Sequence, residues 1–121
     1  MKKFLALKLF CCGLLISGCG GSTQKSCTIT ANVAPANATA DHALAPPGNQ
    51  VQFTTQSSAF GDCPLAPDTL GTWSTSDATN TSISQQGLAI CLNATTTPAA
   101  ISNSGTARSI KAFAPAALTC R

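Results

Sequence analysis

Polar and apolar residues alternate in several short segments of the chain, and this alternation predicts β-strands. In residues 27–33 every second residue is apolar and the residues between are threonine or asparagine. Residues 50–56 repeat the pattern, with Val51, Phe53 and Thr55 at alternate positions that would share one face of a strand. A two-residue period places alternate side chains on a core and a solvent face. We therefore expect two strands with Phe53 in the core, the first of them ended by Pro35 and the Ala/Asn-rich residues after it.

Further β-prone segments are separated by turn-forming residues. They cover residues 71–76, 81–84, 88–92, 99–102 and 109–120. Turns are expected at 46–49 and 77–80, and residues 103–105 (Asn-Ser-Gly) predict a hairpin between the last two segments. Pro115 cannot donate a ladder hydrogen bond, which predicts an edge or a bulge there. Phe113 is out of phase with its neighbours, so a bulge or an exposed ring is expected. About seven short strands without a sustained helical period predict an all-β sandwich, with Trp73 packed between the sheets.

The formal charge of +3 comes from the first residues of the chain. Lys2, Lys3 and Lys8 precede an uncharged apolar run over residues 9–17, an arrangement typical of a signal peptide. After residue 18 the basic and acidic residues are equal in number. A nucleic-acid footprint needs clustered Lys and Arg, so the composition argues against nucleic-acid binding.

The apolar run closes on Ile16-Ser17-Gly18-Cys19, which resembles the lipobox of bacterial lipoproteins. The resemblance implies that residues 1–18 form a helical signal peptide that is removed. Cys19 would then carry a diacylglycerol that attaches the protein to a membrane, and residues 19–26 would form the lipidated cysteine and a flexible tether. Gly20 in place of aspartate resembles the sorting signals of two-membrane bacteria and implies the outer membrane of the cell envelope, on either face. Residues 27–121 would be the folded domain.

Seven cysteines are present, and this assignment removes Cys11 and Cys12 and commits Cys19 to lipid. The remaining four are Cys27, Cys63, Cys91 and Cys120. An even number in a small exported domain predicts two disulfides, with three pairings open. A zinc site is the weaker alternative, because no two of the four are closely spaced and His42 is the only histidine.

Three stretches together resemble bacterial immunoglobulin-like domains of group 2, the invasin/intimin type. They are Gly-Thr-Trp-Ser-Thr-Ser-Asp (71–77), Ile-Ser-Gln-Gln-Gly-Leu-Ala (83–89), and Ala-Ala-Ile (99–101) followed by Ala-Ala-Leu-Thr-Cys (116–120). The resemblance covers residues 28–120 and implies an immunoglobulin-like β-sandwich found in stalks, adhesins and accessory modules of enzymes. The cysteines and the long loop around Cys63 depart from the family pattern.

The strand arrangement of this family implies a disulfide pairing. The start of the first strand and the loop between the second and third strands would share one end of the sandwich, which favours Cys27 with Cys63. The ends of the fifth and last strands would meet at the other end, which favours Cys91 with Cys120. Cys91 is out of phase with Leu88, Ile90 and Leu92, so it is expected to face away from the core.

Candidate chemistry is sparse. Asp41-His42 is the only adjacent acid–imidazole pair, and a catalytic role for it is the alternative to a solvated loop. Asp62 and Asp68 could contact calcium, but two carboxylates supply too few oxygens. We expect no cofactor, no metal and no catalysis.

The candidate binding loop contains Phe60, Asp62, Leu65 and Asp68, because long loops on rigid sandwiches carry recognition. Its ligand would be a protein or a carbohydrate. The sequence thus predicts a lipid-anchored, non-catalytic envelope protein that serves as an adhesion, binding or structural module. The alternatives are a small exported enzyme using Asp41 and His42, or a passive envelope spacer without a ligand.

Overall fold

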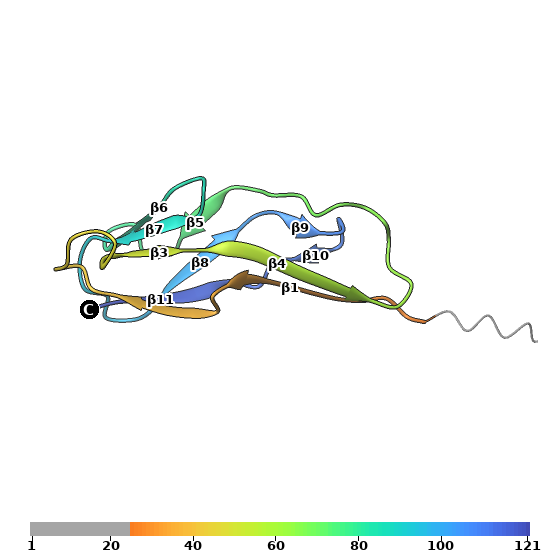
Figure 1. The fold of residues 1–121 in the computed structure, drawn as a ribbon, viewed down its shortest axis with the longest axis horizontal. Helices are drawn as coiled ribbons and strands as arrows, with labels where there is room; N and C mark the ends of the chain where they lie inside the picture. Colours follow the sequence, from red (N-terminus) through yellow and green to blue (C-terminus); the bar gives the residue numbers. More distant parts are fainter. Residues whose placement is uncertain (1–24) are drawn as a thin grey trace, which may run out of the picture.

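The computed structural model describes residues 25–121. The predicted signal peptide, Cys19 and most of the tether lie outside the described residues. Residues 25–121 form an all-β, sandwich-like domain, and they contain no helix long enough and apolar enough to cross a membrane (Figure 1). The expected all-β class is therefore confirmed.

Eleven strands make up the described part of the chain. They are β1 (Thr28–Ala34), β2 (Asn37–Ala40), β3 (Gln50–Gln52), β4 (Thr54–Phe60), β5 (Trp73–Thr75), β6 (Thr81–Ile83), β7 (Leu88–Cys91), β8 (Ala99–Asn103), β9 (Thr106–Ala107), β10 (Lys111–Ala112) and β11 (Ala116–Cys120). The number exceeds the expected seven because single predicted strands are divided and because β2 occupies a stretch expected to be irregular. Each division marks a place where the chain changes its pairing partner.

One layer is built around residues 50–60. This segment pairs through β3 with β7 and through β4 with β1, and β7 also pairs with β6, all antiparallel. The break falls at Phe53, whose N–H donates to the main-chain oxygen of Gly87 at 2.8 Å. One continuous segment thus serves two ladders, which is why a single predicted strand becomes two.

The other layer has the order β2-β11-β8-β5, in which β2 runs parallel to β11. The chain therefore changes layers at Pro35 and Ala36, between β1 and β2. The last two predicted segments do pair antiparallel, through β8 and β11. The predicted turn at residues 103–105 does not join them directly, because a separate β9–β10 hairpin lies between them. Pro115 lies between β10 and β11 and so removes no hydrogen bond from either ladder.

The core fills the space between the two layers. Val33 and Phe53 from the first layer and Ile101 and Leu118 from the second are fully buried, as expected for Phe53. Trp73 is half-buried and packs against this cluster. The Phe113 ring is only 5% exposed, so the alternative of an exposed ring is wrong. β10 ends at Ala112, and Ala114 then exchanges main-chain hydrogen bonds with Ala31 and Val33 of β1, so Phe113 lies between segments with different pairing partners.

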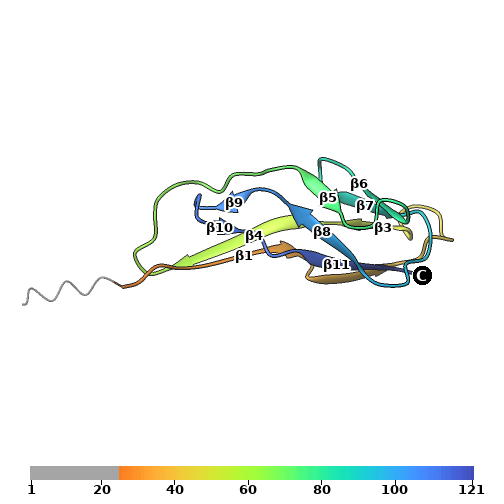
Figure 2. The same ribbon diagram turned by 180° about the vertical axis from the view of Figure 1, so that it is seen from behind.

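The domain is elongated, and residue 25 and residue 121 lie at opposite ends in both views (Figures 1 and 2). Disulfides join Cys27 to Cys63 and Cys91 to Cys120, with Cα–Cα distances of 4.6 and 5.6 Å. The pairing implied by the family resemblance is confirmed. The first bridge lies near the end where residue 25 enters, and the second lies near the end of β11.

The expected orientation of Cys91 is wrong. Cys91 is 2% exposed and shares the inner face of β7 with Ala89, while Leu88 and Ile90 lie on the half-buried outer side. Both faces of this short strand carry apolar residues, so alternation alone allows two orientations. The disulfide to the buried Cys120 selects the orientation of β7 in which the smaller side chains, Ala89 and Cys91, face the core.

Candidate functional site

The candidate binding loop follows β4 and projects at the end of the domain where residue 25 enters (Figures 1 and 2). Its apolar side chains are unusually open to solvent, since Phe60 is 73% exposed and Leu65 is 95% exposed. Asp62 and Asp68 are also exposed. The four residues predicted for the binding loop thus all lie on one exposed segment. Its most exposed large side chains are apolar.

The first half of the loop is fastened to the incoming chain. The Cys27–Cys63 bridge is one connection, and the N–H of Asp62 donates to the main-chain oxygen of Lys25 at 2.9 Å. Gly61 adopts a φ of 88°, and a Cβ there would overlap the main-chain oxygen of Ser26. Glycine is required at this position, because it allows both the left-handed conformation and the close approach of the two segments.

The second half of the loop is fastened to the β9–β10 hairpin. The carboxylate of Asp68 accepts hydrogen bonds from the Ser57 hydroxyl and from the Arg108 N–H, the latter at 3.1 Å. The Arg108 guanidinium donates to the main-chain oxygen of Pro64 at 2.6 Å. Asp68 is therefore occupied by partners within the domain, and its role is to hold the loop in place.

Sequence reasoning missed Arg108 and the turn that presents it. Arg108 and Ser109 have φ values of 46° and 62°, and the turn closes with the Ile110 N–H donating to the Ala107 oxygen at 3.1 Å. A left-handed pair usually contains Asn or Gly, and neither occurs here. The one available signal was that Arg108 is among the few charged residues of the domain.

Neither a metal site nor a pocket is formed by residues 25–121. No three metal-ligating side chains of His, Cys, Asp or Glu gather there, and Asp62 and Asp68 do not form part of such a group. Within the same residues no pocket is detected.

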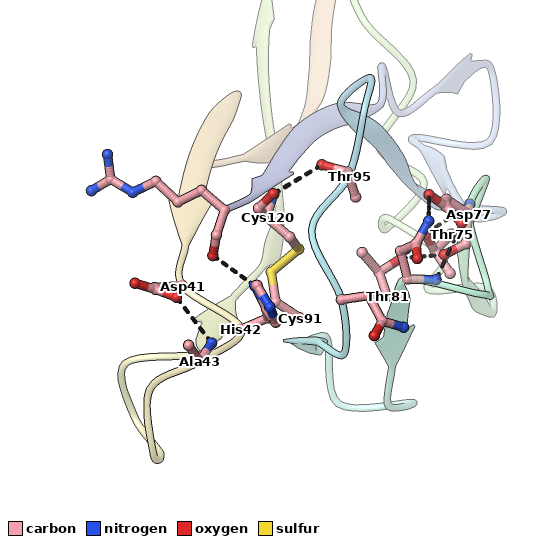
Figure 3. The surroundings of a disulfide bond; sticks show 12 residues. Asp41, His42, Ala43, Thr75, Asp77, Thr81, Cys91, Thr95 and Cys120 are labelled. Carbon is pink, nitrogen blue, oxygen red and sulfur yellow. Dashed lines mark hydrogen bonds between the residues drawn. A yellow bond between two sulfur atoms is a disulfide. The ribbon is translucent and has the colours of Figure 1, made fainter.

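Asp41 and His42 lie at the opposite end of the domain, close to the Cys91–Cys120 bridge (Figure 3). The Asp41 carboxylate accepts a hydrogen bond from the Ala43 N–H at 2.9 Å, which forms an Asx turn. His42 Nδ1 is 2.9 Å from the main-chain oxygen of Arg121, which also accepts the His42 N–H. The hydrogen bonds of this pair thus go to the main chain, where they fasten residues 41–48 to the end of β11.

The same end contains polar contacts that periodicity did not reveal. The Thr95 hydroxyl accepts a hydrogen bond from the Cys120 N–H at 3.0 Å (Figure 3). Thr81 is fully buried, and its hydroxyl bonds to Thr75 at 2.6 Å and to the main-chain oxygen of Asp77 at 2.7 Å. These contacts close turns around the second disulfide and carry no reactive group.

Comparison with models of protein families, with curated proteins and with solved structures gives no match to this chain.

Proposed function

We propose that this chain is a lipid-anchored bacterial envelope protein with a single immunoglobulin-like domain. It acts without catalysis, as an adhesion, binding or structural module. The observation that carries the proposal is the geometry of an elongated β domain whose chain enters at one end, with a disulfide near each end. Such a domain, attached through Cys19, would hold its far end away from the membrane.

The strand order supports the immunoglobulin-like assignment. That fold pairs strands A-B-E-D in one sheet and C-F-G in the other. Here β1, the β4/β3 segment, β7 and β6 follow the first order, and β5, β8 and β11 follow the second. The parallel pairing of β2 with β11 adds a short strand beside the last one, after the chain has changed layers.

The disulfides support export from the cytoplasm, because such bonds persist in oxidising compartments. They join all four cysteines of residues 25–121 in two pairs, which leaves Cys19 for the lipid. A short polar segment between Cys19 and the first strand fits a tether.

Intact mass of the full chain, purified from bacterial membranes without reductant, tests the anchor. We expect a chain that begins at Cys19, carries acyl groups and lacks four thiol hydrogens. The matched control is Cys19→Ser, which should keep residues 1–18 and remain unacylated while forming both disulfides. An unacylated parent chain, or one that retains residues 1–18, would overturn the anchor.

The hydrogen bonds of Asp41 and His42 favour a structural role for this pair over catalysis. His42→Ala should lower the free energy of unfolding by about 1 kcal/mol through the lost contact to Arg121. It should leave any hydrolytic activity of the purified protein unchanged. Loss of an activity in a variant that stays folded would instead support the enzyme alternative.

A binding module, unlike a passive spacer, should co-purify with one stoichiometric partner after crosslinking in intact cells.

A further inference from the structure

We propose that Phe60 and Leu65 rest on the lipid surface to which Cys19 anchors the chain. Together with the exposed Lys25 and Asp62 they are called the proximal tip here. This inference rests on the lipid anchor proposed above and assigns the ligand of the candidate binding loop. That ligand is a membrane surface, contacted by apolar side chains beside the point where the chain enters the domain.

A rigid link joins the tip to the entering chain. The Cys27–Cys63 bridge and the Asp62-to-Lys25 hydrogen bond place residues 61–63 directly against residues 25–27. The close approach at Gly61 fixes the same contact from the main chain. The tip therefore cannot move away from the point at which the tether joins the domain.

The tether is short. Lys25 follows Cys19 by six positions, and six fully extended residues reach at most about 22 Å. Whatever path these residues take, Lys25 stays within that distance of the lipidated cysteine. The tip is consequently the part of the described domain that must remain near the membrane. Residues 41–48 are fastened by His42 to Arg121, at the opposite end of the long axis where the C-terminus is marked (Figure 1).

The chemistry of the tip favours contact with lipid. Phe60 and Leu65 expose most of their surface to water, and transfer of apolar surface out of water is favourable. The loop is already held by the disulfide, by Asp68 and by Arg108, so inserting it costs little additional ordering. Lys25 and Asp62 have opposite charges, so the contact should not require anionic lipids.

Tryptophan reporters on the full-length, acylated chain test this contact. Leu65→Trp places the reporter on the tip, and Leu44→Trp places a matched reporter on an exposed leucine at the far end. Both chains keep Trp73, which contributes the same background emission. Each is reconstituted in phosphatidylcholine vesicles whose acyl chains carry bromine, a short-range quencher, and in unbrominated vesicles for comparison.

We expect Leu65→Trp to shift its emission to the blue and to lose intensity on brominated vesicles, while Leu44→Trp shows neither change. Emission of Leu65→Trp that matches Leu44→Trp on both kinds of vesicle would overturn the proposal. A blue shift that grows with protein density, without bromine quenching, would show that a second copy covers the tip and would also overturn it.

Vesicle flotation separates this inference from the anchor on which it rests. If the acylated parent floats and Cys19→Ser does not, the anchor stands, and the quenching comparison then decides the tip contact alone. If the parent fails to float, both proposals are wrong. Formation of both disulfides, checked by mass in each variant, shows that the compared chains share one fold.

Discussion

Replacing Cys91 and Cys120 by alanine should destabilise the domain more than the same replacement of Cys27 and Cys63. Loop length alone predicts nearly equal losses, because the bridges span 29 and 36 residues. The chain-entropy relation gives about 3.6 kcal/mol for the shorter loop and about 3.8 kcal/mol for the longer one. On that basis the Cys27–Cys63 variant would be slightly the less stable.

Burial reverses the order. Cys91 and Cys120 are 2% and 1% exposed, whereas Cys27 and Cys63 are only half-buried. Removing two sulfur atoms from the core leaves unfilled volume and loses apolar contacts. This should lower the free energy of unfolding by about 2 kcal/mol more. The total loss is then about 5–6 kcal/mol for the Cys91–Cys120 variant, comparable with the whole stability of many small domains.

Equilibrium unfolding in urea without reductant measures the difference, with Trp73 emission as the signal because its half-buried ring packs on the core. For m near 1–2 kcal/mol/M, a difference of about 2 kcal/mol separates the midpoints by about 1–2 M urea. A Cys91–Cys120 variant already unfolded in buffer, beside a folded Cys27–Cys63 variant, gives the same order. Equal midpoints, or a lower one for the Cys27–Cys63 variant, would refute the burial argument.

Three single substitutions test local geometry by the same unfolding assay or by proteolysis. Gly87→Ala should cost more than about 2 kcal/mol, because φ is 82° and a Cβ would overlap the Phe53 oxygen; a loss below about 1 kcal/mol would contradict this. Ser109→Gly should stabilise by about 0.5–1 kcal/mol by relieving the positive φ of 62°, and a lowered midpoint would count against that strain. Asp68→Ala removes the acceptor of the Arg108 N–H, so limited proteolysis should cut residues 61–70 faster; an unchanged rate would mean that the disulfide alone holds the loop.

Much of the fold could be predicted from local features of the sequence. Alternation predicted β1, the segment that contains Phe53, and the short strands around Trp73 and Gly87, because a strand's two-residue period is written into adjacent residues. The number of cysteines predicted two disulfides, and the family resemblance implied the pairing that the structure contains. The candidate loop was also predicted, since its Pro, Gly and Asp content is local information.

The tertiary structure decided which partner each strand takes and which face it buries. The break at Phe53, the parallel pairing of β2 with β11, and the inward orientation of Cys91 all depend on segments far away in sequence. The contact of Asp68 with Arg108 joins residues 40 positions apart and turns a predicted ligand-binding carboxylate into a support for the loop. Periodicity records only neighbouring residues, so contacts of this separation appear only once the chain has folded.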